Sequence, residues 1–300
     1  TVPSAPDGST NFFYGEGVYS HTQTQGVLAR GEMNLNSRWT AFGAVGRALH
    51  SYDGFIFGTR PVWTAANAAT GNATGTAYNS WGAYQTTAAE AGVRGQFATG
   101  SVAHRLTLAA NVLQYEGGSR NNGTAAINSN LFNPTLITMP AGAAASTFKK
   151  LNDDVMTALS AVDTLALLDD KLQLTLGLRA QQVHQKLANY QETAVTPLVG
   201  VVAKPWGEQV SLYGNYVEGL SAGATVQTRY ANAGGTFKPY QSKQMEVGVK
   251  WQTGDILQTV SLFQISKPAL MVVNNVQRPD GEQRNRGVEW MVSGPLNKQV

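Results

Sequence analysis

Alternation of apolar and polar residues is the sequence feature that most limits the fold of this chain. Leucine occupies every second position of Leu172–Arg179, and polar or glycyl residues lie between. The segment Met245–Trp251 repeats this scheme. Because successive side chains of a strand point to opposite faces, a period of two predicts β-strands that each have one apolar face. The connections between these strands then decide which all-β fold they build.

The composition argues against three broad classes. Charged residues make up 14% of the chain, compared with roughly 25% in typical soluble domains. No segment approaches the run of about 18 apolar residues that a membrane helix needs. The net charge of +3 is dispersed, without the stripe of Lys and Arg that nucleic-acid binding requires. We therefore expect neither a soluble globular domain, nor a helical membrane protein, nor a nucleic-acid partner. The absence of cysteine suits export through an oxidising compartment.

Alternation predicts about eleven strands of roughly ten residues, joined by two alternating kinds of connection. The expected strands are 25–35, 38–52, 80–97, 102–115, 155–167, 171–186, 194–204, 208–218, 242–252, 256–267 and 284–293. Tight connections are expected at 36–37, 98–101, 168–170, 205–207 and 253–255. Mostly longer connections are expected at 53–79, 116–154, 187–193, 219–241 and 268–283. Short turns on one side and long loops on the other are typical of an outer-membrane β-barrel.

Aromatic residues close to the tight turns support the barrel. A barrel has a girdle of aromatic side chains at the membrane interface, and four residues lie where the periplasmic girdle should be. These girdle candidates are Trp39, Phe97, Trp206 and Trp251. Ordinary core packing is the alternative for any one of them. Their common position next to short turns favours the girdle.

Charged residues in the expected strands fall out of phase with the apolar ones. They include Arg30, Glu32, Arg179, Glu246 and Lys250. A lysine or arginine that faces lipid near the midplane costs about 2–4 kcal/mol, so we expect these side chains to point into a polar lumen. The alternative is the solvated face of a soluble sheet. The sorting of short and long connections favours the barrel.

The strand count predicts that the chain is part of a larger barrel. An open sheet edge cannot stay unpaired in hydrocarbon, and bacterial single-chain barrels close with an even number of strands. Thr1–Thr10 lacks the basic start and apolar core of a signal peptide, and Gly294–Val300 suggests a turn before another strand. We expect residues 1–300 to form part of one barrel domain.

Four segments resemble the barrel domain of TonB-dependent ferric-siderophore receptors, in the order and spacing of that family. They are Leu167–Arg179, Lys204–Leu220, Pro239–Lys250 and Gly281–Glu289. The resemblance implies an all-β, antiparallel barrel of about 22 strands in the bacterial outer membrane, closed inside by an N-terminal plug. Neither a plug nor a TonB box is recognisable in this chain.

The resemblance also implies partners and cargo. Family members bind a ferric siderophore and import it when the TonB complex acts on the plug, so iron arrives as a chelate and no cofactor is expected. Outer-membrane lipid is a further partner, and we expect a monomer. A hydroxamate chelate such as ferrichrome or coprogen is favoured by the resemblance. Catecholate and mixed chelates stay open.

Aromatic residues in or near the long loops are the candidate ligand-binding residues. Trp and Tyr offer a chelate a flat packing surface and a hydrogen-bonding tip. The candidates are Tyr52, Trp63, Trp81, Tyr84, Tyr115, Phe132, Tyr230 and Tyr240. Packing within a loop or an outer girdle is the alternative for each. Arg284 and Arg286 could attract an anionic chelate or pair with carboxylates of the plug or barrel.

Two other functions stay open on the sequence. A passive porin-type channel would show the same strands and loops, but no plug. A secreted hydrolase could use Ser221, because Gly219–Gly223 matches the Gly-x-Ser-x-Gly elbow, although no helical period follows it as that elbow requires. Without that helix we do not expect catalysis. The four histidines lack the close spacing of a structural zinc site, so we do not expect metal ligands. The favoured function is energy-coupled import of a ferric siderophore.

Overall fold

The computed structural model describes residues 17–55, 62–63, 65–67, 69–135, 150–221, 223–227 and 229–295. Nearly all of them lie in strands of one 12-stranded sheet. The strands are β1 (Ser20–Asn34), β2 (Trp39–Gly54), β3 (Val62–Trp63), β4 (Asn72–Thr99), β5 (Val102–Asn130), β6 (Lys150–Leu167), β7 (Leu172–Gln185), β8 (Tyr190–Ala203), β9 (Val210–Ser221), β10 (Tyr240–Thr253), β11 (Ile256–Val273) and β12 (Val276–Ser293). Two 3-10 turns are η1 (Ala65–Asn67) and η2 (Lys186–Ala188). In the described ranges, no helix is long and apolar enough to cross a membrane.

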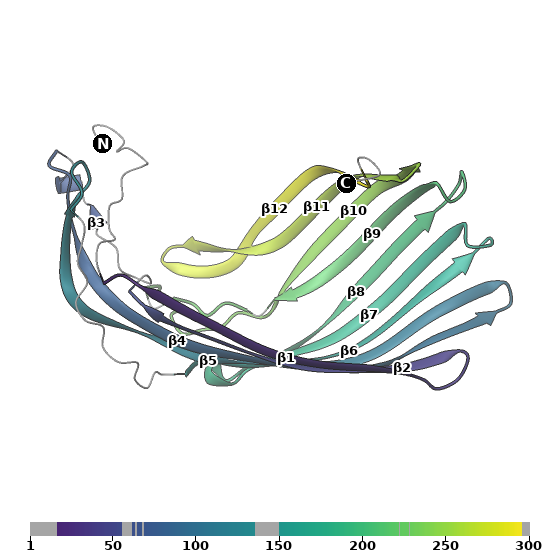
Figure 1. Cartoon of the computed structure of the whole chain (residues 1–300), viewed down its shortest axis with the longest axis horizontal. Coiled ribbons are helices and arrows are strands. Elements are labelled where there is room, and N and C mark those ends of the chain that lie inside the picture. The colour runs from purple at the N-terminus through teal and green to yellow at the C-terminus, as the bar shows by residue number, and fades with distance from the viewer. Residues whose placement is uncertain are drawn as a thin grey trace. The chain divides into compact units, whose positions relative to one another are not determined.

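Strands that follow one another in the chain are neighbours in the sheet. The order is β1-β2-β4-β5-β6-β7-β8-β9-β10-β11-β12, and the short β3 pairs with β4. The pairings from β6 to β12 are all antiparallel, as Figure 1 shows for the successive hairpins. This succession of hairpins confirms the predicted all-β, antiparallel fold.

The chain divides into two compact units, and each is described by itself. Unit 1 contains Thr1–Leu28, Gly46–Thr87 and Gln114–Asp153. Unit 2 contains Ala29–Val45, Ala88–Leu113 and Asp154–Val300. Strands β1, β2, β4, β5 and β6 contribute residues to both units, whereas β7 to β12 belong to unit 2.

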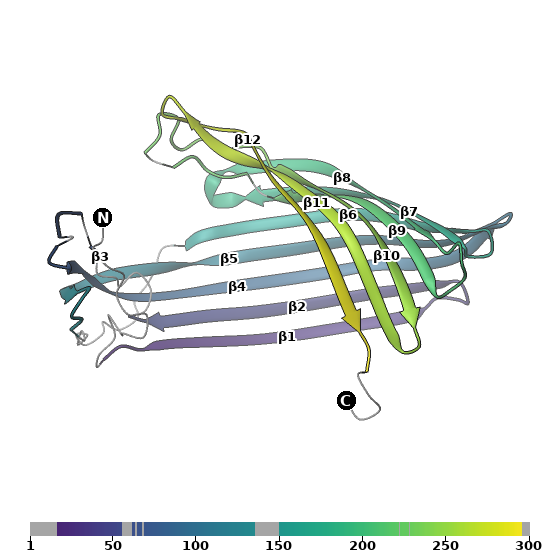
Figure 2. The same cartoon turned by 90° about the horizontal axis from the view of Figure 1, so that it is seen from above.

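The strand register in unit 2 sorts side chains onto an apolar face and a polar face. Cross-strand partners point to the same side of a sheet, so rows of partners define each face. One row across β7 to β12 is Leu174, Val201, Gly214, Val247, Leu262 and Val288. The next row is Thr175, Gly200, Asn215, Glu246, Phe263 and Gly287. The alternation read from the sequence is therefore continuous across six neighbouring strands, of which β10, β11 and β12 lie side by side in Figure 2.

Strand ends at the tight turns agree with the prediction, but the strands extend further than predicted on the loop side. Strand β4 begins at Asn72 rather than 80, and β5 ends at Asn130 rather than 115. The long loop predicted at 268–283 is wrong, because β11 and β12 meet at a tight turn. Asn274 and Asn275 form it with φ values of 49° and 62°, a left-handed conformation that asparagine tolerates. Residues 1–10, 136–149 and 296–300, about which the sequence made predictions, lie outside the described residues.

Unit 1 contains a small apolar cluster whose buried residues lie in two of the predicted long loops, 53–79 and 116–154. Phe55, Ala77 and Ile127 are buried in it, and Val18 and Tyr19 pack against them. The backbone N–H of Phe55 donates to the carbonyl oxygen of Tyr19 at 3.0 Å, and the two rings meet edge to face with centroids 5.8 Å apart. The cluster gives this part of the chain a small apolar core without an alternating sequence.

Candidate functional site

Three of the predicted ligand-binding residues come together in unit 1. Tyr52, Tyr84 and Tyr115 form a stack in which neighbouring ring centroids are 6.5 Å and 5.9 Å apart and neighbouring planes differ by 18° and 7°. We call these three residues the tyrosine stack. The ring of His50 lies 6.3 Å from that of Tyr52, and His50 Nδ1 is 3.0 Å from the hydroxyl of Thr24. The stack is a row of parallel aromatic rings, a geometry that suits the flat faces of a chelate.

The order of the strands explains why these tyrosines meet. They come from β2, β4 and β5, which are neighbours in the sheet. Gly82 makes room for the stack, because a Cβ at this position would lie 2.8 Å from the ring of Tyr52. The sequence marked each tyrosine as a candidate but gave no register, so it could not predict that they stack.

An ionic network lies on the other side of the same strands. Gln85 and Glu116 directly follow Tyr84 and Tyr115, so their side chains point to the opposite face. Gln85 donates to Glu116 at 3.2 Å and accepts a hydrogen bond from Arg47. Lys150 bridges Glu116 at 2.7 Å and Asp153 at 3.1 Å. A groove of about 540 Å³ borders the network, lined by Gln23, Gln25, Leu49, His50, Ser51, Ala83, Tyr84, Gln85, Glu116, Gly117 and Lys150.

The other candidates of unit 1 lie outside the tyrosine stack. Trp81 is buried, and the guanidinium of Arg120 lies 6.0 Å from its ring centroid. Phe132 is exposed, in the short segment that follows β5. Trp63 belongs to β3, and its side chain lies outside the described part of the structure.

Two candidates lie in unit 2, close to the connection between β9 and β10. The guanidinium of Arg229 lies 4.9 Å from the ring centroid of Tyr230. Tyr240 begins β10 opposite Ser221, and its hydroxyl is buried with no hydrogen-bond partner among the described residues. An unpaired buried polar group costs about 1–3 kcal/mol, so this hydroxyl is a candidate hydrogen-bonding group for a ligand.

Sequence reasoning missed the residues that hold this connection. Asn232 donates from its side chain to the carbonyl oxygen of Gln277 at 2.8 Å, and its side-chain oxygen accepts from the N–H of Gln277 at 3.0 Å. These two hydrogen bonds fasten the β9–β10 connection to β12. A polar pair that is 45 residues apart leaves no pattern in the sequence.

The register places the two candidate arginines on the apolar face of unit 2. Arg286 lies opposite Gln264, which lies opposite Met245, one row from Val247, Leu262 and Val288. Arg284 pairs with Glu282 at 2.6 Å. A barrel carboxylate is thus the partner of Arg284, which was one of the two roles expected for it. Both arginines lie on the face opposite to Glu246, away from the polar face of the sheet.

The girdle candidates lie at the tight-turn ends of their strands. The ring of Trp39 stacks on Phe97 at 6.3 Å, and Phe97 stacks on His104 at 4.7 Å. Trp206 is 70% exposed in the turn between β8 and β9. Trp251 lies on β10 opposite Val210 and Gln258, two residues from the next turn.

An unpredicted polar relay lies beside these rings. Asp163 is opposite Leu176, which places its carboxylate on the apolar face. His104 Nδ1 is 2.7 Å from Asp163 Oδ2, and His104 Nε2 is 2.7 Å from the hydroxyl of Thr99. In the sequence, Asp163 is in phase with Leu159 and Leu165, which indicates a carboxylate on the apolar face of the strand.

A charged cluster joins the tight turns of unit 2. Asp170 accepts a hydrogen bond from Gln173 at 2.8 Å and lies 3.4 Å from Arg105 and 3.5 Å from Lys204. The Gln173 hydrogen bond, followed by the charges of Lys204 and Arg105, holds the pKa of Asp170 below its ordinary value. A hydrogen bond to Glu208 raises the pKa of Lys204. The cluster links the ends of three hairpins by charge.

The described residues offer little for catalysis or metal binding. Ser221 ends β9, and an isolated bridge between Thr225 and Thr236 follows it instead of the helix that a nucleophile elbow needs. No group of three or more His, Asp or Glu side chains in the described ranges could hold a metal ion.

Known proteins are similar to this chain in sequence and in fold. A family model described as TonB-dependent receptor-like, β-barrel, matches residues 2–297. The ferrichrome receptor FcuA of Yersinia enterocolitica is 33% identical over 315 residues, which cover 98% of this chain and 40% of that protein. The ferric preacinetobactin receptor BauA from Acinetobacter baumannii is 28% identical with a TM-score of 0.74, over 93% of this chain and 43% of BauA. The ferric-catecholate import receptor Fiu of E. coli, at 16% identity and a TM-score of 0.79, covers 96% of this chain and 47% of Fiu and shows the fold alone. The chain thus spans less than half the length of each of these relatives.

Proposed function

Because this chain belongs to the TonB-dependent receptor β-barrel family, we propose that it forms part of a receptor that binds a ferric siderophore at the extracellular face and imports it with energy supplied by TonB. Proteins of this family lie in the bacterial outer membrane and are not enzymes, and the same holds for this chain. The energy reaches the receptor through a plug domain, and the receptor acts as a monomer. The ferrichrome receptor FcuA, which is 33% identical to this chain, supports this proposal.

The two faces of unit 2 support a membrane-spanning wall. The row Leu174, Val201, Gly214, Val247, Leu262 and Val288 faces lipid, because apolar side chains lose nothing in hydrocarbon. The row that contains Asn215 and Glu246 faces the lumen, where water and polar groups are available. Turns such as Thr253–Ile256 then lie in the periplasm, and the longer connections lie outside the cell.

The tyrosine stack is the observation that carries the ligand part of the proposal. It contains neutral aromatic side chains, and the polar groups beside it include the imidazole of His50, the hydroxyl of Thr24 and the side chain of Ser119, which hydrogen-bonds Tyr52. Three hydroxamates bound to Fe³⁺ form a neutral complex, whereas three catecholates leave it with a large negative charge. The three residues of the stack carry no positive charge, which suits the neutral complex. We therefore favour a ferric hydroxamate of the ferrichrome type.

Binding to the purified full-length receptor tests this proposal. Titration with ferrichrome should quench tyrosine and tryptophan fluorescence saturably. Tyr84→Ala should weaken binding about tenfold or more, because it removes the middle ring of the stack, whereas Tyr84→Phe should bind within about threefold of the wild type. If ferrichrome does not bind saturably, or if Tyr84→Ala binds as tightly as the wild type, the stack is not the ligand surface.

A further inference from the structure

Two rings of the tyrosine stack each lie over a glycine of the next strand. A Cβ at Gly82 on β4 would lie 2.8 Å from the ring of Tyr52 on β2. A Cβ at Gly117 on β5 would lie 2.8 Å from the ring of Tyr84 on β4. The three strands are neighbours in the sheet. Each ring therefore leans across the adjacent strand and covers a position that has no side chain of its own.

The hydroxyl of Tyr52 is held as well as its ring. It hydrogen-bonds the side chains of Tyr84 and Ser119. Ser119 lies on β5 two residues beyond Gly117, so its side chain points to the face of the sheet that the rings cover. A tyrosine that is fixed at both its ring and its tip loses less conformational freedom when a ligand binds, which favours binding.

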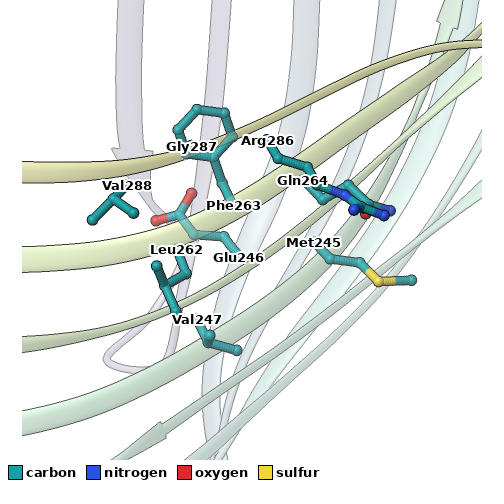
Figure 3. Close-up of a pocket in the computed structure, with 9 residues that line it drawn as sticks. All are labelled: Met245, Glu246, Val247, Leu262, Phe263, Gln264, Arg286, Gly287 and Val288. Carbon is teal, nitrogen blue, oxygen red and sulfur yellow. The ribbon is translucent and has the colours of Figure 1, made fainter.

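Rings that cover glycines also occur in unit 2, away from the tyrosine stack. A Cβ at Gly287 would lie 2.6 Å from the ring of Phe263, and Figure 3 shows this ring beside Gly287 on β12. A Cβ at Gly248 would lie 2.7 Å from the ring of Tyr213. Strand packing alone explains those pairs. Gly82 differs from them because the ring that covers it belongs to the stack and carries the hydrogen bond to Ser119.

We propose that Gly82 and Ser119 are positioning residues of the ligand surface. Gly82 leaves room for the ring of Tyr52 to lie against the wall, and Ser119 holds its hydroxyl, so the ring turns its free face toward the bound chelate. Both residues act through Tyr52, and neither needs to touch the ligand. This assignment rests on the proposed function, because it names what fixes the geometry of the same surface.

Gly82→Ala separates positioning from folding. Its methyl group would meet Cε1, Cζ and Oη of Tyr52, the far end of a flexible side chain, so the ring moves while the backbone keeps its place. The full-length variant should therefore keep the heat-dependent gel mobility of the folded wild type. In fluorescence titrations it should bind ferrichrome about fivefold more weakly or worse. Ser119→Ala should weaken binding about threefold, as expected for one lost hydrogen bond.

Gly248→Ala is the matched control. Its methyl group would meet the same three atoms of Tyr213, which lies three residues from the start of β9 at a tight turn and outside the stack. This variant should bind ferrichrome within about twofold of the wild type.

A double variant shows whether Gly82 acts through the ring. G82A/Y52A should bind ferrichrome as Y52A does, because no ring is left to displace, whereas an independent effect of Gly82 would add to the loss. Uptake by cells gives a second readout. G82A should raise the half-saturating ferrichrome concentration and leave the maximal rate unchanged, whereas a folding defect would lower the maximal rate.

The proposal is overturned if G82A or Y52A binds ferrichrome like the wild type, or if G248A loses as much affinity as G82A. It is also overturned if G82A weakens binding equally in the Y52A background. Wild-type affinity of S119A contradicts the role of Ser119. A wild-type receptor that does not bind ferrichrome contradicts the proposed function instead, so the two failures are distinguishable.

Discussion

Asp163 shows how a charged residue is accommodated on a face that carries mostly apolar side chains. Its carboxylate contacts His104 at 2.7 Å, and the hydroxyl of Thr99 contacts the other ring nitrogen. Phe97 covers the imidazole by stacking at 4.7 Å. The relay pairs Oδ2 of Asp163, whereas Oδ1 is buried with no hydrogen-bond partner among the described residues. The relay lies close to the tight turns, where polar groups cost least.

Removing one member of the relay should destabilise the barrel. His104→Leu leaves the carboxylate of Asp163 unpaired, at a cost of about 1–3 kcal/mol in unfolding free energy. The double change His104→Leu with Asp163→Leu should recover most of that loss, because an apolar pair suits this face. Urea unfolding of the full-length protein in lipid vesicles measures both. If the double variant is no more stable than His104→Leu, the interaction between His104 and Asp163 does not stabilise the barrel.

The charged cluster at the turns should make stability depend on acid. The folded-state pKa of Asp170 is lowered. Its contribution to folding stability is therefore fully present above the ordinary carboxyl pKa of about 3.9, and it is lost as pH falls through the lowered value. Asp170→Asn should therefore flatten the loss of stability between about pH 5 and pH 2. Unfolding midpoints over this range compare the two proteins. Equal slopes would show that Asp170 does not contribute.

Glycines opposite aromatic rings determine how closely neighbouring strands pack in unit 2. A Cβ at Gly248 would lie 2.7 Å from the ring of Tyr213, and a Cβ at Gly287 would lie 2.6 Å from the ring of Phe263. Each pair is a direct cross-strand neighbour in the register. A ring that covers a glycine on the next strand shields its backbone and gains packing area. The sequence shows the glycines but not which ring covers which one.

Gly92→Ala should destabilise the packing between neighbouring strands. A methyl group there would collide with the carbonyl oxygen of Leu108 and with the ring of Phe42, and the backbone oxygen has no room to move. We expect a loss of about 1–3 kcal/mol in unfolding free energy. Gly200→Ala is the control, since its methyl would lie 3.7 Å from the Cβ of Thr175, an ordinary contact. Equal stabilities of the two variants in urea unfolding would contradict the packing argument.

The strand ends show what the sequence could and could not predict. At the tight turns the predicted ends agree closely with the structure, because the apolar period runs up to the membrane interface. On the loop side β4 and β5 continue well past the predicted ends. A strand that has left the hydrocarbon no longer needs an apolar face, so its Asn, Gly, Thr and Ser residues resemble a loop sequence. The candidate tyrosines could be identified from their residue type and their position in or near the long loops. Their stacking depends on the register of the paired strands, which the sequence did not predict.

At the scale of the whole molecule, the proposed function rests on the amphipathic sheet and on the family. The lipid-facing and lumen-facing rows run without interruption from β7 to β12. This chain covers 40% of the length of FcuA, so transport is a property proposed for the receptor that contains it. The alternating strands are shared by passive channels, and energy coupling is what separates the two functions.

Uptake of ⁵⁵Fe-labelled ferrichrome by cells that carry the full-length receptor as their only route tests the central claim most directly. We expect saturable uptake that is abolished when TonB is deleted or the proton gradient is collapsed, and that is reduced in the Tyr84→Ala variant. Uptake that continues without TonB and rises linearly with concentration would contradict an energy-coupled receptor and indicate a passive pore.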